Sequence, residues 1–236
     1  MVGVLELTQG RGRARLERWS LLGLELPRAR TPVPAGLGGA RLARRVDWGA
    51  KLLAKAGVRR VLTAAGFPCR DVLARRGLEP VDPGPFCRFL AAPLVLAALE
   101  KLGVAPERAS VSLWAPVVSP TLLRAAEALC PRVRLLSVDV PREREALAAW
   151  LWREFGAAVP APGRRAHAAV WFAAGGGEGE AVLRLYGPAP DLAGLALTPP
   201  AALVETGLDP LSAMALLWEA GRLDGQKIAI SSTAQT

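Results

Sequence analysis

The sequence contains no asparagine, one histidine, one tyrosine, two isoleucines and four lysines among its 236 residues. The single histidine, His167, excludes any mechanism that needs two imidazoles within one chain. Three cysteines, Cys69, Cys87 and Cys130, cannot pair completely, and they lack both C-x-x-C spacing and nearby histidines. That pattern argues against a disulfide framework or a zinc site, so we expect reduced thiols and no metal.

Long hydrophobic runs are also missing. The apolar stretch from Phe89 to Leu99 is far shorter than the roughly 18 residues of a membrane span and is interrupted by Pro93. The segment Met1–Glu6 has no basic region before an apolar one, so it does not resemble a signal peptide. An apolar fraction of 51% is ample for a globular core. We therefore expect a cytoplasmic protein that does not enter a membrane.

The net charge of +9 raises the question of an anionic partner. Only 4 of the 30 basic residues are lysines, and residues with A/T-rich codons are scarce throughout. A GC-rich genome explains this choice of arginine over lysine, and we give it more weight than nucleic-acid binding. The best case for an RNA or DNA partner is a basic face in the N-terminal part with two tryptophans left outside the core: Arg11, Arg13, Arg15, Arg41, Arg44, Arg45, Trp19 and Trp48.

The first half of the chain alternates between strand and helix patterns. The segment Pro27 to Gly39, rich in Pro, Gly and Arg, is the clearest linker. We expect strands at residues 2–7, 21–26, 58–64 and 78–82, and helices at 40–56, at about 69–76 and at 86–102, the last kinked or interrupted at Pro93.

Residues Ser110 to Val140 follow a strand, loop, helix, strand pattern. The loop Pro116-Val117-Val118 leads to Ser119-Pro120, which opens a helix, and Asp139 stands near the end of the second strand. This is the layout of a dinucleotide-binding βαβ unit, but the loop has no glycine. Glycine lets the backbone approach a pyrophosphate closely, whereas Pro116 removes an N–H donor.

On these residues, the stretch from Val104 to Phe172 resembles a Rossmann-like domain of the kind found in dehydrogenases and tRNA-linked reductases. The resemblance implies an α/β, three-layer sandwich with a mainly parallel sheet in residues 104–236, beside a smaller α/β lobe in residues 1–103. It also implies NAD or NADP as the cofactor, with Asp139 on a ribose hydroxyl and with Ser119 and Pro116 in the loop that faces the pyrophosphate.

The remaining motifs are weaker. The glycine-rich run Gly175–Gly179 precedes a strand rather than a helix, so we interpret it as a flexible hairpin between strands at 168–172 and 181–186. Cys69 and Arg75 have the C-x5-R spacing of a phosphatase but no glycine between them for a cradle of N–H groups. Asp209 before Pro210 is expected to cap a helix. Four tryptophans are expected in the core: Trp114, Trp150, Trp171 and Trp218.

The leading hypothesis is a degenerate Rossmann-like protein that binds a small metabolite or nucleotide, without dinucleotide-dependent catalysis. One alternative is an NAD(P)-linked oxidoreductase with an unusual loop. The other is a basic module that binds nucleic acid or protein. Quenching of tryptophan fluorescence by a cofactor would favour the oxidoreductase, and salt-sensitive oligonucleotide binding would favour the basic module.

Overall fold

The computed structural model describes residues 1–160 and 165–232, which form two compact units. Unit 1 comprises residues 1–82 and 199–224, and unit 2 comprises residues 83–198 and 225 onward. The expected boundary between residues 103 and 104 lies elsewhere because helix α4 (Ala91–Lys101) packs against α5 and the second sheet. Residues 161–164 of the Rossmann-like stretch lie outside the described residues.

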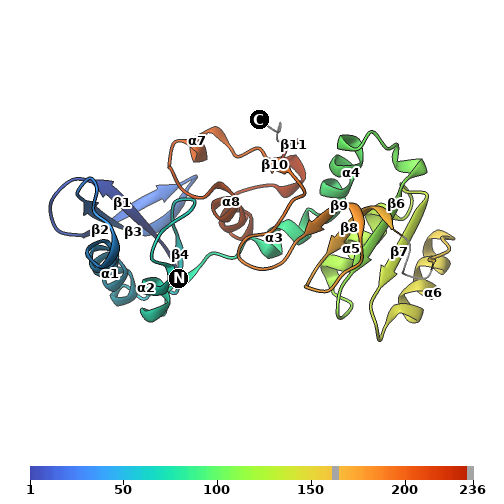
Figure 1. The fold of residues 1–236 in the computed structure, drawn as a ribbon, viewed down its shortest axis with the longest axis horizontal. Coiled ribbons are helices and arrows are strands. Elements are labelled where there is room, and N and C mark those ends of the chain that lie inside the picture. Colours follow the sequence, from blue (N-terminus) through green and yellow to red (C-terminus); the bar gives the residue numbers. More distant parts are fainter. Residues whose placement is uncertain (161–164, 233–236) are drawn as a thin grey trace. The chain divides into compact units, whose positions relative to one another are not determined.

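Unit 1 is built on a five-stranded sheet with the order β2-β3-β1-β4-β5. Strands β1 to β4 are labelled in Figure 1, with helices α1 and α2 beside them. Strands β1, β3, β4 and β5 are parallel, and β2 pairs antiparallel with β3 at the edge. The bounds of its elements are β1 (Val2–Gln9), β2 (Arg15–Leu21), β3 (Leu24–Val33), α1 (Gly39–Lys55), β4 (Arg60–Leu62), α2 (Arg70–Arg75), β5 (Glu79–Pro80), α7 (Ala201–Val204) and α8 (Pro210–Glu219).

The segment expected to be a linker, Pro27 to Gly39, is instead largely strand: β3 includes Pro27 and continues to Val33. Pro27 is paired with Arg18 of β2 but precedes Arg28, where the pairing of β3 with β1 begins, so at Pro27 the strand has one neighbour and the missing N–H is tolerated. The linker prediction failed because the composition of a segment does not show whether it pairs with strands that are distant in the sequence.

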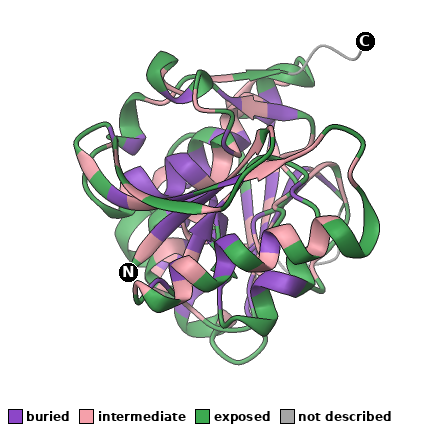
Figure 2. Cartoon of the chain, turned by 90° about the vertical axis from the view of Figure 1, so that its left-hand side faces the viewer, coloured by how far each residue is buried: buried purple, intermediate pink, exposed green. Residues whose placement is uncertain are grey.

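Helix α1 lies on the sheet of unit 1 at a glycine. A Cβ atom on Gly49 would stand 2.5 Å from Leu5 Cδ1 and closer still to Thr31 Oγ1, so only glycine allows this approach. Around it lies the core of unit 1, which combines β1, β3, α1 and α2: Leu5, Ala29, Val46, Ala50, Leu53, Val58, Val61, Phe67, Val72, Leu73 and Leu78. In Figure 2 the buried residues gather in the strands and on the inner sides of the helices.

Residues 199–224, by which the chain comes back to unit 1 after unit 2, are hydrogen-bonded to β4 and to the residue that follows it. The Arg60 guanidinium donates to both carboxylate oxygens of Glu219, at 3.2 and 2.7 Å, and Asp209 N–H donates to the carbonyl of Thr63 at 2.8 Å. Asp209 also accepts from Ser212 N–H at 3.1 Å, which confirms the predicted helix cap. These contacts explain why the segment belongs to unit 1.

Unit 2 is built on a four-stranded, fully parallel sheet with the order β7-β6-β8-β9. Helices α4 and α5 pack together, and α6 packs against β7. The bounds of its other elements are α3 (Gly84–Phe89), β6 (Ser110–Trp114), α5 (Pro120–Leu129), β7 (Leu135–Asp139), α6 (Arg144–Phe155), β8 (Ala166–Trp171), β9 (Gly179–Arg184), β10 (Leu195–Leu197) and β11 (Ile230–Ser232), the last two forming a separate antiparallel pair.

Two local predictions in unit 2 need correction. Strands β8 and β9 are parallel, so the glycine-rich run between them is a crossover and not a hairpin. The expected interruption of the helix over residues 86–102 is present, but it lies at Leu90, between α3 and α4, and not at Pro93, which stands in the first turn of α4, where a missing N–H is tolerated.

The parallel strands of the two units have the same order. Numbered along the chain within each unit, both sheets have strand order 2-1-3-4: β3-β1-β4-β5 in unit 1 and β7-β6-β8-β9 in unit 2. This is a doubly wound, Rossmann-like α/β arrangement, as expected from the sequence, in the order that places the third strand beside the first. Within the described residues, no helix is long and apolar enough to span a membrane.

Candidate ligand site on the second sheet

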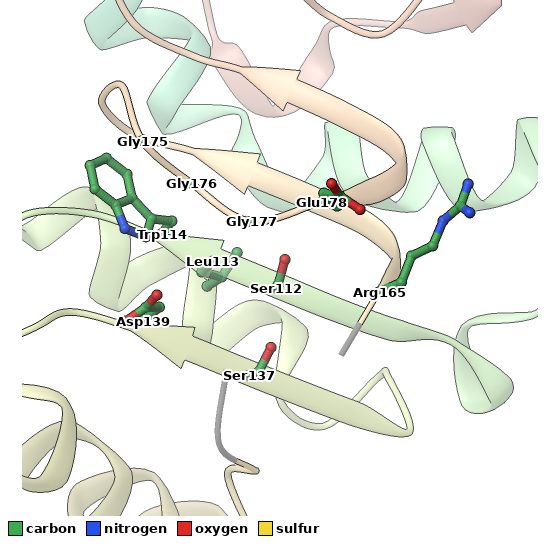
Figure 3. A pocket seen from close by; sticks show the side chains of 10 residues that line it. All are labelled: Ser112, Leu113, Trp114, Ser137, Asp139, Arg165, Gly175, Gly176, Gly177 and Glu178. Atoms are coloured by element: carbon green, nitrogen blue, oxygen red, sulfur yellow. The ribbon is translucent and has the colours of Figure 1, made fainter. Parts of the chain in front are cut away.

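The strand order of unit 2 reverses at β6. From β6 the chain passes through α5 to β7 on one side, and the later strand β8 lies on the other side. In open α/β sheets, ligands bind outside the carboxyl ends of the strands where the order reverses in this way. A cavity of about 460 Å³, within the size range of small-molecule sites, begins at these carboxyl ends, at Trp114 and Asp139, and extends over the face of the sheet to Arg165, just before β8 (Figure 3).

The floor of the cavity is a polar face of the sheet. Ser112 of β6 and Ser137 of β7 are directly paired neighbours, as are Trp114 and Asp139 one step further along. All four are half-buried, whereas the alternate residues of both strands, such as Val111 and Val138, are buried. Side chains of a strand alternate between the two faces, so hydroxyls and a carboxylate line the face that no core covers.

The wall of the cavity is the glycine-rich crossover from β8 to β9. A Cβ on Gly175 would lie 3.3 Å from the Trp114 ring, and one on Gly176 would overlap the Trp171 ring. The Trp171 indole N–H donates to the carbonyl of Gly177 at 2.9 Å. The glycines therefore allow the backbone to lie flat on two indoles, in a connection where a helix would otherwise cover the sheet.

Three charged side chains complete the lining: Asp139, Glu178 and Arg165. Within residues 1–160 and 165–232, the carboxylate of Asp139 and the hydroxyl of Ser112 have no hydrogen-bond or ion-pair partner. Ser137 makes only a long bond of 3.4 Å to the carbonyl of Val111. The hydroxyls and the Asp139 carboxylate are therefore available to bind a ligand. The lining has two acidic side chains, Asp139 and Glu178, and one basic side chain, Arg165.

The three residues predicted to bind a cofactor do not lie together at the cavity. Asp139 lines it, at the carboxyl end of β7. Pro116 and Ser119 are not among the lining residues. The Ser119 hydroxyl caps α5 by accepting from Leu122 N–H at 3.2 Å and lies 3.1 Å from the Thr121 hydroxyl. A role of these three residues in binding a cofactor stays a prediction.

The place where a dinucleotide fold binds pyrophosphate is filled from within the chain. Glu143, the residue before α6, accepts a hydrogen bond from the Val118 backbone N–H at 2.7 Å, immediately before the Ser119 cap. A carboxylate is favoured at this position for the same reason as a phosphate, because the start of a helix carries partial positive charge. The chain thus supplies its own anion at the start of α5.

The other sequence candidates do not form a catalytic group. Nδ1 of His167 lies 3.0 Å from the Ser110 backbone N–H, which makes this nitrogen an acceptor. Arg75 pairs with Asp71 at 2.9 Å, so its guanidinium is engaged within α2. Burial raises the pKa of the Cys130 thiol, which keeps it protonated. Within the described residues, no group of three or more His, Cys, Asp and Glu side chains could hold a metal ion.

The tryptophans predicted to lie in the core do not lie there. None of the four expected in the core is among the buried residues; they are half-buried, and Trp114 and Trp171 contact the glycine crossover. Four lining residues were not predicted from the sequence: Ser112, Ser137, Arg165 and Glu178. The signal available was the alternation of serine and apolar residues in β6 and β7, which marks a face left open to polar groups.

No protein-family model and no curated protein matches the sequence. Among solved structures, the chain is similar to the L-tryptophan dehydrogenase from Nostoc punctiforme, with 15% identity and a TM-score of 0.31. The match covers 61% of this chain and 44% of that structure, so it spans less than half of the dehydrogenase. The Rossmann-like arrangement described above rests on the strand order and not on this similarity.

Proposed function

We propose that unit 2 binds a small hydroxyl-rich metabolite of about the size of a nucleoside, without dinucleotide-dependent catalysis. The observation that supports this most is the set of unpartnered polar groups on the open face of the sheet, Ser112 and Asp139, beneath the glycine crossover. Three cysteines that are free of disulfides agree with a reducing compartment, and the proposal places the protein in the cytoplasm.

The lining defines the chemistry of the ligand. The Asp139 carboxylate accepts hydrogen bonds only, and Ser112 and Ser137 can both donate and accept, so the floor suits vicinal hydroxyls or an amine. The Trp114 ring offers an aromatic wall for a planar group. With Asp139 and Glu178 against Arg165, the lining carries one net negative charge and disfavours a strongly anionic ligand.

Glu143 restricts the ligand further. A pyrophosphate at the start of α5 would have to displace this carboxylate from the Val118 N–H, and Pro116 offers no N–H in exchange. Two anions at one helix terminus repel each other. We therefore expect nucleosides and sugars to bind in preference to nucleotides with two or more phosphates.

A thermal-shift and calorimetric comparison tests the proposal. The purified protein is titrated with nucleosides, with the matching mono- and triphosphates, and with NAD and NADP. A ligand at 100 times its dissociation constant stabilises the folded state by about 2.7 kcal/mol. We expect at least one nucleoside to stabilise the protein, with the effect lost in Asp139→Ala.

The matched control is Glu107→Ala, which removes an exposed carboxylate of unit 2 away from the cavity. This variant should respond to the nucleoside as the unmodified protein does. A nucleoside effect that survives Asp139→Ala, or the absence of any effect across the series, would contradict the proposed site.

The second candidate is an NAD(P)-linked oxidoreductase, which one observation favours: Asp139 ends β7, the position from which an acidic residue binds ribose in dinucleotide folds. Stabilisation by NAD or NADP but by no nucleoside, lost in Asp139→Ala, would support this candidate over the first.

A further inference from the structure

The excess positive charge is concentrated at one end of the chain. Residues 1–55 contain 11 basic and 4 acidic residues, a formal charge of +7. The remaining residues, 56–236, contain 19 basic and 17 acidic residues, a formal charge of only +2. A genome-wide preference for arginine acts on the whole chain, so it explains the abundance of arginine but not this localisation.

The topology of unit 1 brings several of these residues to the ligand-binding edge of its sheet. The loop from residue 10 to residue 14 leaves the carboxyl end of β1, passes β3 and enters β2, which lies on the far side of β3. A groove of about 240 Å³ lies here, lined by exposed arginines at both ends of the loop and on β3: Arg11, Arg13, Arg15 and Arg30. This is the carboxyl edge of the parallel strands, where α/β sheets bind ligands.

The groove carries positive charge that its own acids offset only in part. Arg15 and Arg30 are directly opposite each other on β2 and β3, where like charges destabilise a sheet, and Arg30 has one acidic neighbour, Glu6 at 3.7 Å. Glu17, the acid of the groove, is bonded to Arg28 at 2.7 Å. Within the described residues, Arg11, Arg13 and Arg15 have no ion pair.

A second hollow of about 320 Å³ continues from the groove, since Arg13 lines both. It lies along α1 and is lined by Trp48, Lys51 and Lys55. Trp48 is 41% exposed, which is unusual for so large an apolar side chain. The Arg45 guanidinium lies 4.8 Å from the centre of the Trp48 ring and donates to the Gly12 carbonyl at 2.6 Å, which ties the loop to the helix.

We propose that this surface, the groove and the hollow joined at Arg13, binds single-stranded nucleic acid. The arginines of the groove contact successive phosphates, and the Trp48 ring stacks on an unpaired base with the face opposite the Arg45 guanidinium. Basic grooves with an exposed aromatic side chain bind single strands in this way, because every base has a π-face and stacking does not require a particular sequence. A duplex keeps its bases paired and unavailable to Trp48.

Two features favour nucleic acid over a membrane surface. The hydrophobic residues of the hollow are a tryptophan held beneath a guanidinium and the half-buried Leu52, with no further large apolar side chains to insert into lipid. The charge is also arranged along a groove rather than over a flat face.

The test measures the binding of fluorescein-labelled oligo-dT and oligo-U of about 20 nucleotides by fluorescence anisotropy over a series of salt concentrations. If four phosphates are neutralised, the logarithm of the association constant should fall with the logarithm of salt with a slope of about −3. Combined substitution Arg11→Ala, Arg13→Ala and Arg15→Ala should weaken binding and reduce this slope by about 2. Trp48→Ala should weaken binding by about fivefold or more with the slope unchanged, and Trp48→Phe should restore most of it.

A charge-matched variant serves as the control. Arg108→Ala, Arg134→Ala and Arg222→Ala together remove three exposed arginines outside the surface and should leave both affinity and slope nearly unchanged. An equal loss of binding in this control would show a general effect of net charge and overturn the proposal. So would tighter binding to a duplex of the same length, tighter binding to vesicles that contain anionic lipid, or no binding of either oligonucleotide at low salt. Circular dichroism verifies that each variant is folded.

Discussion

The parallel strands of the two units have the same order. The units differ in which pair of consecutive parallel strands is connected without a helix. In unit 1, the chain passes from the first to the second parallel strand through the antiparallel strand β2. In unit 2, that connection is the helix α5, and the helix is missing instead between β8 and β9, where a glycine-rich segment lies on the sheet. Each unit has its candidate site at the connection that has no helix.

This difference determines the chemistry at each site. A short strand connection at the carboxyl edge of unit 1 presents side chains outward, and the sequence places arginines there. A glycine crossover in unit 2 presents almost no side chains and exposes the face of the sheet, where serines and an aspartate lie. The same scaffold therefore offers a cationic edge in one unit and a slightly anionic cavity in the other, as expected when function resides in the site rather than in the fold.

The largest effect is expected at the helix contact in unit 1. Gly49→Ala places a methyl group against Leu5 and Thr31, and overpacking of this kind should lower the free energy of unfolding by about 2 to 3 kcal/mol, despite the better helix propensity of alanine. Denaturant unfolding measures the loss. Gly38→Ala, where a Cβ meets nothing within 4 Å, is the control and should cost much less.

A smaller effect is expected at the glycine crossover of unit 2. Gly176→Ala pushes a methyl group into the Trp171 ring, so the crossover must lift, with a loss of about 1 to 2 kcal/mol and a loss of the nucleoside-induced thermal shift. The neighbouring Gly177→Ala meets nothing within 4 Å and should leave both stability and binding intact. If the two variants behaved alike, the crossover would not depend on close packing against the indole.

Removal of the Glu143 carboxylate at the start of α5 should reduce stability less than the two glycine substitutions do. Glu143→Ala removes the acceptor of the Val118 N–H at the start of α5 and should lower the free energy of unfolding by about 1 kcal/mol. Glu145→Ala, in the first turn of α6, removes a carboxylate with no such bond and is the matched control. Thermal unfolding compares them, and equal losses would mean that the bond to Val118 has no particular importance.

The smallest effect concerns the pair that joins α1 to the end of α2. The hydrogen bonds from Arg76 hold the pKa of Asp47 below its ordinary value of 3.8. A depressed pKa means that the stabilisation is present above the unfolded-state pKa and is lost as the pH falls through the folded-state pKa. Asp47→Asn should therefore be slightly less stable at pH 7 and equal to the unmodified protein in strong acid, as measured by urea unfolding at several pH values. Solvent screens this pair, so a large difference at pH 7 would contradict the assignment.

The sequence was sufficient where structure is local. The order of strands and helices from α1 onward, the Asp209 cap and the position of Asp139 at a strand end all follow from short-range patterns, and the structure confirms them. The strand predicted at residues 21–26 is wrong, because Leu22 and Gly23 form the turn between β2 and β3. The sequence was insufficient to predict the fold where two segments that are distant along the chain pair with each other. Five residues from Gly175 to Gly179 can form either a hairpin or a crossover, and only the parallel pairing of Ala168 with Ala181 decides between them.

The cavity was missed for a related reason. Trp114 and Trp171 lie in apolar strands, a pattern typical of core residues, but they face the side of the sheet that the missing helix leaves open. Their exposure depends on the connection between β8 and β9. The excess of charge in residues 1–55 could be counted from the sequence, whereas the groove that collects it follows from the path of the chain across β3.

The most direct test of two sites with opposite chemistry is an NMR spectrum of the indole N–H groups of the seven tryptophans, assigned with single Trp→Phe variants. We predict that the nucleoside found by thermal shift perturbs the signals of Trp114 and Trp171 and leaves Trp48 unchanged, and that a single-stranded oligonucleotide does the reverse. If both ligands perturbed the same indoles, or if neither perturbed any of these three, the division of function between the two units would be contradicted.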